Sequence, residues 1–148
     1  MAYKNASSTY KETKIKTASQ GQLIIMLYDE AIRQLNLAVE QLEQTKIQKK
    51  AHSKIEQISK AVMKAEEIIT ELMVSLDFEQ GGEISKNLFS LYSWFNRELL
   101  EANIAQNPDR IRKVKEMLGE LRNSWFEIAQ KYNADPVNRE AVGLNIAG

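Results

Sequence analysis

Apolar residues recur every three or four positions along most of the chain, which is the spacing of one face of an α-helix. The pattern divides into four stretches, over about residues 19–44, 55–76, 83–103 and 107–132. The second stretch is the most regular, with Ile55, Ile58, Val62, Ala65, Ile69, Leu72 and Leu76. The third carries Ile84, Leu88, Leu91, Phe95, Leu99 and Ala102 as its expected core positions. One apolar stripe per helix and short connections predict an all-α, antiparallel four-helix bundle.

Helix-start signals support two of these boundaries. Ser19 followed by Gln22 has the spacing of a capping box, which satisfies backbone donors at a helix start. Asn107, Pro108 and Asp109 suit an N-cap, a first helical position and a first turn respectively. We therefore expect helices to begin near residues 19 and 107.

The glycine pair 81–82 separates the second stretch from the third, and neither end of the chain continues the helical pattern. Residues 1–18 are polar and rich in lysine, serine and threonine, which predicts a flexible N-terminal arm. Residues 133–148 form a C-terminal tail in which Val142, Leu144 and Ile146 alternate with other residues. The expected organisation is an arm over 1–18, a bundle over 19–132 and a tail over 133–148.

Composition and charge narrow the function further. The 148 residues are 43% hydrophobic and 27% charged, a balance typical of a single globular domain. Twenty basic and twenty acidic residues cancel, so no bulk charge attracts nucleic acid. The chain lacks cysteine, an apolar leader and any run near the ~20 apolar residues of a membrane span. We expect a cytoplasmic protein without direct membrane insertion.

No motif for catalysis, for a cofactor or for a metal site is present. There is no glycine-rich phosphate loop, nucleophile elbow or HExxH pattern, so the chain is predicted not to be an enzyme. His52 is the single histidine, and it leaves open an alternative as a helical phosphotransfer domain. Such a domain is expected to place its histidine in mid-helix, whereas His52 lies near a predicted helix start.

Two helices carry more apolar residues than a single stripe requires. Beside the third helix's core positions lie Phe89, Tyr92, Leu100 and Ile104 on one flank and Trp94 on the other. Beside the first helix's stripe lie Leu23, Ile25 and Met26. These residues either widen the core or form a surface for a partner, by helix-in-groove or extended-peptide recognition. Self-association through this surface is a further alternative.

Several segments together resemble the flagellin export chaperones of bacteria, the FliS family. Residues 17–29, TASQGQLIIMLYD, are similar to the opening of that family's first helix, with Tyr10 and Ile15 at matching distances ahead of it. Residues 91–95, LYSWF, and 97–104, RELLEANI, are similar to its third-helix signature, and Trp125 matches an aromatic of its last helix. The resemblance covers about residues 10–130.

The resemblance implies a chaperone that binds the disordered C-terminal segment of flagellin in the cytosol, blocks premature polymerisation and delivers flagellin to the flagellar type III secretion gate. The further partners implied are the cytoplasmic domain of the membrane export gate and, in some bacteria, flagellar regulators. The flagellin-binding residues expected on this basis are Leu23, Met26, Leu27, Phe89, Tyr92, Trp94 and Leu100. Tyr10 and Ile15 are expected to cap the binding surface and to assist docking at the gate. No cofactor is implied.

Two positions depart from the family pattern. Gln20 stands where the family commonly has proline, and Glu30 stands where it often has glycine. Compared with glycine, a glutamate at position 30 leaves less space for a ligand chain and adds a negative charge.

Overall fold

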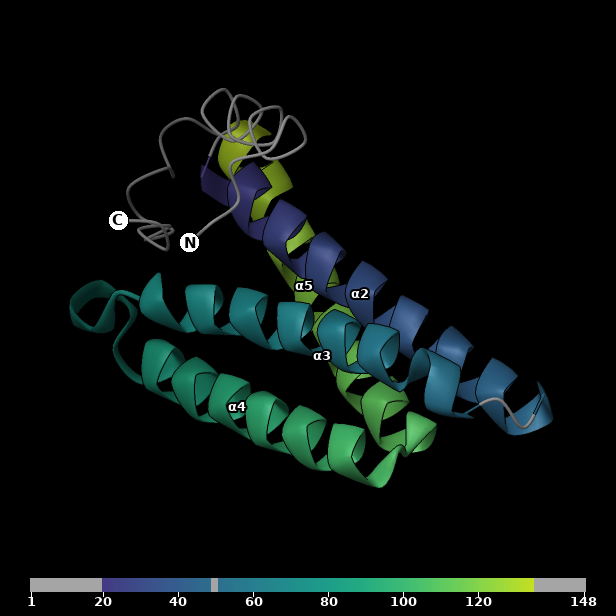
Figure 1. The fold of residues 1–148 in the computed structure, drawn as a ribbon. Coiled ribbons are helices and arrows are strands. Elements are labelled where there is room, and N and C mark those ends of the chain that lie inside the picture. Colours follow the sequence, from purple (N-terminus) through teal and green to yellow (C-terminus); the bar gives the residue numbers. More distant parts are fainter. Residues whose placement is uncertain (1–19, 49–50, 135–148) are drawn as a thin grey trace, which may run out of the picture.

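The computed structural model describes residues 20–48 and 51–134, with side chains described for residues 20–47 and 54–131. It contains four long helices: α2 (Gln20–Gln48), α3 (Ala51–Val74), α4 (Phe78–Ala105) and α5 (Pro108–Ala134). Consecutive helices run antiparallel, which confirms the predicted all-α four-helix bundle (Figure 1). The predicted arm and tail, over 1–18 and 133–148, fall outside the described residues apart from the end of α5.

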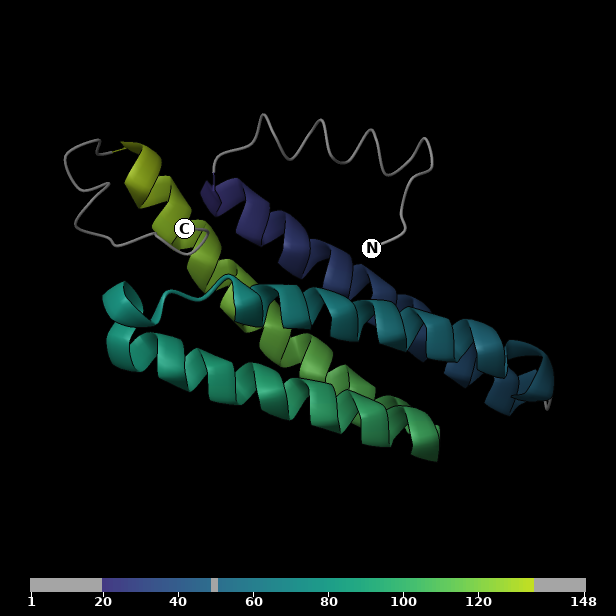
Figure 2. The same cartoon turned by 60° about the vertical axis from the view of Figure 1, so that its left-hand side comes forward.

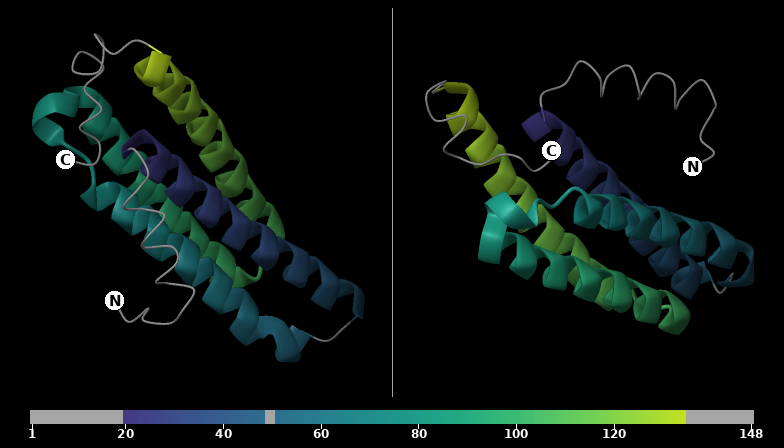
Figure 3. Two further views of the ribbon diagram at one scale, coloured as in Figure 1. Left: turned by 90° about the horizontal axis from the view of Figure 1, so that it is seen from above. Right: turned by 90° about the vertical axis from the view of Figure 1, so that its left-hand side faces the viewer.

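The helices close into a ring in which each packs on two neighbours. α2 packs on α3 and α5, and α4 packs on α3 and α5, so α2 and α4 are diagonal to one another. α2 and α3 converge at the connection between them and separate towards their other ends, as two views of the ribbon show (Figures 1 and 2). The first turns of α2 lie beside the last turns of α5 instead (Figure 3).

The core lies where the four apolar stripes meet. Its largest fully buried aliphatic side chains come from all four helices: Ile24, Leu35, Leu42, Ile58, Ile69, Leu72, Leu99, Ile111 and Leu118. The regular stripe predicted on the second helix is confirmed from Ile58 to Leu72, where its positions are buried, whereas Ile55 at its start is 39% exposed. Burial of each stripe against its neighbours provides most of the stability of such a bundle.

Helix α5 begins as its sequence predicts. The Asn107 side-chain oxygen accepts hydrogen bonds from the backbone N–H groups of Asp109 and Arg110, at 3.0 and 3.2 Å. Gln106 just before it adopts a left-handed conformation that ends α4, with φ of 53°. The N-cap and the reversed residue together turn the chain between two antiparallel helices.

Helix α4 differs from the prediction at its start. It begins at Phe78 rather than near residue 83, because Asp77 caps an extra first turn through the N–H groups of Glu79 and Gln80. Gly82 then breaks the regular helix, with φ of 51° and ψ of −127°. Ile84, expected in the core, is 69% exposed, because the buried side of α4 runs through Ser85, Tyr92, Phe95, Leu99 and Ala102 and Ile84 lies beside it.

Candidate protein-binding surfaces

An aromatic cluster links three helices beneath the candidate surfaces. The hydroxyls of Tyr28 on α2 and Tyr92 on α4 share a hydrogen bond, and Trp125 Nε1 on α5 donates to the Tyr28 hydroxyl at 3.2 Å. Burial, together with the neighbouring Tyr92, raises the pKa of Tyr28 far above its usual value, and burial also raises the pKa of Tyr92. Both phenols are therefore neutral, and the cluster fixes how α2, α4 and α5 pack.

Tyr92 was expected on a partner-binding surface, and the structure places it in the core. Its side chain is 1% exposed, because its ring packs near those of Tyr28 and Phe95 and its hydroxyl has a partner on α2. It therefore supports the bundle and offers no surface to a ligand in this conformation.

The start of α2 carries apolar side chains without a place in the core. Leu23, Ile25 and Met26 are half-buried and do not pack against the core cluster, whereas Leu27 does. This part of α2 is fixed to α5: Gly21 lies so close to Ala129 that an added Cβ would be 3.2 Å from the alanine Cβ. Arg122 on α5 donates to the Asp29 carboxylate at 2.9 Å. The sequence thus places a rigid, partly exposed apolar surface at this end of the bundle.

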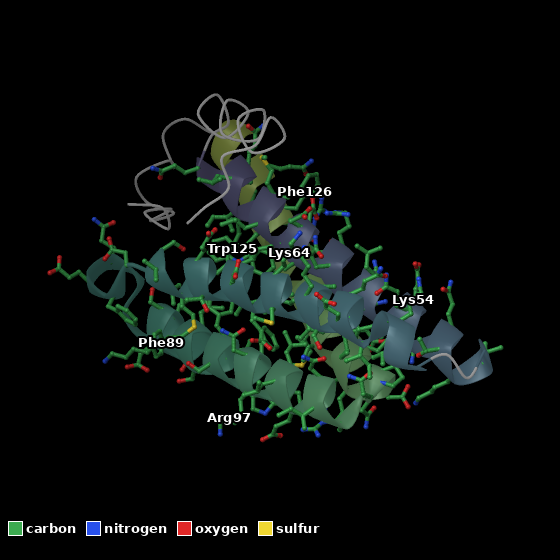
Figure 4. The ribbon with its side chains drawn as sticks, viewed as in Figure 1. Lys54, Lys64, Phe89, Arg97, Trp125 and Phe126 are labelled. Carbon is green, nitrogen blue, oxygen red and sulfur yellow. The ribbon has the colours of Figure 1, made fainter. Side chains whose placement is uncertain are left out.

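The remaining predicted residues lie on opposite sides of α4. Trp94 is on the side that faces α5, since the ammonium of Lys113 lies over its ring at 5.9 Å. Phe89 and Leu100 are exposed on the side that faces α3, where Asn96 Nδ2 donates to Thr70 Oγ1 at 3.1 Å. Figure 4 shows Phe89 and Trp125 at separate places on the molecule. The seven predicted residues therefore do not line one continuous surface.

Sequence reasoning missed exposed apolar residues on α3. Met63 and Val74 lie off the regular stripe of that helix and are 56% and 81% exposed. The signal was present in their spacing, because a residue one or two positions from an apolar stripe points away from the core. Phe126 on α5 was also missed; the guanidinium of Arg122 lies over its ring at 5.1 Å.

The remaining residues singled out in the sequence are Tyr10, Ile15, His52 and Glu30. Tyr10 and Ile15 lie outside the described residues, and His52 is the second residue of α3 with its side chain also outside them. Glu30 is held by its own helix, where its carboxylate accepts hydrogen bonds from Arg33 and Gln34 at 2.7–3.0 Å. The Glu30 carboxylate correspondingly raises the pKa of Arg33. Its charge is therefore largely offset locally.

Over the described parts of the chain, no three His, Asp or Glu side chains gather in a way that could hold a metal ion. None of the four described helices combines the length and apolar character needed to cross a membrane.

Comparison with known proteins gives a consistent result over most of the chain. The profile of the family described as flagellar protein FliS matches residues 3–132. The flagellar secretion chaperone FliS of Salmonella typhimurium is 37% identical over 120 residues, covering 81% of this chain and 84% of the relative. That of Escherichia coli is 32% identical, covering 85% and 89%. That of Bacillus subtilis is 26% identical, covering 91% and 94%.

Proposed function

The chain belongs to the FliS family of flagellar secretion chaperones, and from this premise we propose that it binds the disordered C-terminal segment of flagellin in the cytosol. Binding would cover the apolar face through which flagellin subunits assemble, and so prevent premature polymerisation. The chaperone would then deliver flagellin to the flagellar type III secretion gate. Recognition and release by binding, without catalysis, are sufficient for this role.

The observation that carries the proposal, beside the family, is the apolar surface at the start of α2. Leu23, Ile25 and Met26 are partly exposed at the start of α2, and the aromatic cluster and the Gly21–Ala129 approach hold this end of α2 in place. A disordered segment loses conformational entropy when it binds, and a preformed surface reduces the total cost of association. The surface therefore suits a client that arrives unfolded.

The proposed contact residues form separate groups. Leu23, Met26 and Leu27 form the first group on α2, Phe89 and Leu100 the second on α4, and Trp94 lies apart beside α5. A long, extended client can reach several separate groups at once, which a compact ligand cannot. Tyr92 takes part indirectly, by fixing Tyr28 beneath the first group.

We further propose a role for the N-terminal arm. Tyr10 and Ile15 would cover the surface at Leu23, Met26 and Leu27 in the free protein, and flagellin would displace them. The displaced arm, with Tyr10, would then assist docking on the cytoplasmic domain of the membrane export gate. Flagellar regulators are additional proposed partners, by resemblance to the family.

Calorimetric titration with the C-terminal ~50 residues of flagellin from the same organism tests the proposal. We expect saturable one-to-one binding with a negative heat-capacity change, because apolar surface is buried on association. Leu23→Glu and Met26→Glu should each weaken the affinity by about tenfold, since a charge would be desolvated in the contact.

Ile47→Glu provides the matched control for that titration. Ile47 is 82% exposed near the other end of α2, so the same substitution should leave the affinity within about twofold. Circular dichroism would establish that all three variants remain folded. If the wild-type protein showed no binding at tens of micromolar, flagellin would not be the client.

A further inference from the structure

The contact between α2 and α5 has a small apolar area along one flank. We call it the α2–α5 flank; it consists of Ile25 on α2 and Phe126 on α5. Ile25 is half-buried and does not pack against the core cluster, and Phe126 is 40% exposed. Neither residue is among the proposed flagellin contacts or beneath the proposed position of the N-terminal arm.

On α2, Ile25 lies between two residues that contact α5. It is one helical turn after Gly21 and one turn before Asp29, so the three share one side of the helix. Gly21 lies against Ala129, and the Asp29 carboxylate accepts a hydrogen bond from Arg122 at 2.9 Å. Ile25 therefore points along the α5 side of α2.

On α5, Phe126 lies between the same two contacts. It is one turn from Arg122 and one turn from Ala129, and because the helices are antiparallel it is level with Ile25. The Arg122 guanidinium lies over the Phe126 ring at 5.1 Å and also pairs with Asp29. Since these two charges offset each other, the flank suits an uncharged apolar segment.

The C-terminal tail contains a segment of that kind. Residues 141–148, AVGLNIAG, include no charged side chain, and Val142, Leu144 and Ile146 alternate with other residues. In an extended chain alternate side chains point to one side, so these three would form an apolar row about 13 Å long. Such a row can cross from α2 to α5, because the axes of packed helices are about 8–10 Å apart. The family match ends at residue 132, before this segment.

We propose that residues 142–146 lie in extended form across the α2–α5 flank, with the apolar row of the tail against Ile25 and Phe126. The tail then holds α2 and α5 together at the end of the bundle where the first helix meets the last. This role is separate from the proposed binding of flagellin and does not depend on it.

The chain between α5 and this segment is long enough for the contact. Helix α5 ends at Ala134, and Pro136 disfavours its continuation. Phe126 is eight residues before Ala134, about 12 Å back along the helix. Val142 is eight residues beyond Ala134, a length of up to about 26–29 Å when extended. The chain can therefore turn back and reach the flank.

The covalent connection favours the tail over a separate molecule as the occupant. A tethered segment has an effective concentration in about the millimolar range, so a contact of a few side chains is enough to hold it. A separate protein would need an interface of about 1,000 Å² or more. The flank offers two apolar side chains, which suits the tethered segment.

Amide hydrogen exchange of full-length variants tests the docking. Leu144→Glu places a charge in the apolar row, and Asn145→Glu is the matched control, since it places the same charge on the opposite side of an extended segment. We expect Leu144→Glu to accelerate exchange over residues 24–29 and 122–129 about tenfold, because that end of the bundle opens more easily. Asn145→Glu should change it less than about twofold.

A variant of the flank tests whether the tail acts at this place. Phe126→Gln removes the apolar ring from α5, so adding Leu144→Glu to it should accelerate exchange less than about twofold further. A full tenfold effect of Leu144→Glu in the Phe126→Gln background would place the tail elsewhere and overturn the inference.

A spin label reports the position of the tail directly. The chain contains no cysteine, so Asn145→Cys can be labelled at a single site. The label should broaden the amide NMR signals around Ile25 and Phe126 more strongly than those around Ile47, near the other end of α2. Leu144→Glu, added to the labelled protein, should abolish that difference.

Three further results would overturn the inference. The first is exchange in Leu144→Glu equal to that of the wild type. The second is equal acceleration by Leu144→Glu and Asn145→Glu, which would indicate a general effect of added charge. The third is broadening in a mixture of labelled molecules and unlabelled, isotope-enriched ones, equal to that within one molecule, which would assign the contact to a second copy.

Discussion

At the scale of single residues, the Tyr28 hydroxyl has the largest number of roles in the described core. It accepts from Trp125 Nε1 and shares a hydrogen bond with Tyr92, so one atom connects helices α2, α4 and α5. Each partner is at least partly withdrawn from water, and a buried polar group that loses its partner costs more than the bond itself contributed. The sequence pattern placed Tyr92 on a flank, because periodicity does not show that a hydroxyl will find a partner across the core.

The Tyr28 hydroxyl has two hydrogen-bond partners and the Tyr92 hydroxyl has one, which gives a prediction for two matched variants. Tyr28→Phe should lower the free energy of unfolding by about 1–3 kcal/mol, because Trp125 and Tyr92 both lose their partner. Tyr92→Phe should cost less, since the Tyr28 hydroxyl still accepts from Trp125. Urea unfolding followed by circular dichroism measures both values, and a larger loss for Tyr92→Phe than for Tyr28→Phe would contradict this account.

At the scale of helices, the sequence predicted how many helices there are, their order and most of their boundaries. The prediction was wrong at the start of α4, for a local reason. The Asn107 cap and the stripe of α3 were both predictable, because each depends on residues close together in the chain. The start of α4 was not, because the Asp77 cap adds a turn before the break at Gly82. Ile84 was placed in the core because the pattern did not show that Ser85, a polar residue, lies on the buried side of α4. Phe89 and Trp94 lie on opposite flanks of α4, as their angles around the helix indicated, but the angles did not identify α3 and α5 as the helices on those two sides.

The break in α4 can be tested with two glycine substitutions. Gly82 has φ of 51° and ψ of −127°, a combination that residues with a Cβ rarely adopt, so Gly82→Ala should destabilise the protein by roughly 1–3 kcal/mol. Gly119 lies within α5 with open space around it, so Gly119→Ala should stabilise by about 0.5–1 kcal/mol. Thermal unfolding of the pair would show opposite signs; a stabilising Gly82→Ala would exclude a requirement for glycine at the break.

At the scale of the whole molecule, apolar surface is distributed over distant parts of one rigid bundle. The start of α2 packs beside α5, whereas the exposed apolar residues Met63, Val74, Phe89 and Leu100 lie on α3 and α4, and α2 is diagonal to α4. The sequence indicated surplus apolar residues on both helices. It could not indicate their separation, because that depends on the order in which four helices close into a ring.

Removal of the N-terminal arm tests the relation between the arm and the bundle. The described core is formed by residues from Ile24 onwards, so deletion of residues 1–16 should leave helical circular dichroism and the unfolding temperature nearly unchanged. Flagellin should bind several-fold more tightly, because Tyr10 and Ile15, which are proposed to cover the start of α2, are then absent. Loss of helix after the deletion would show instead that the arm is part of the folded core.

The closed ring of helices also has a kinetic consequence. Three of its four contacts join helices that follow one another in the chain, and these can form early because short connections cost little loop entropy. The fourth joins α2 to α5, where Asp29 meets Arg122 from 93 positions away. That contact should form last during folding and open first under destabilising conditions. The end of the bundle proposed to receive flagellin is therefore also the end whose closure completes the native state.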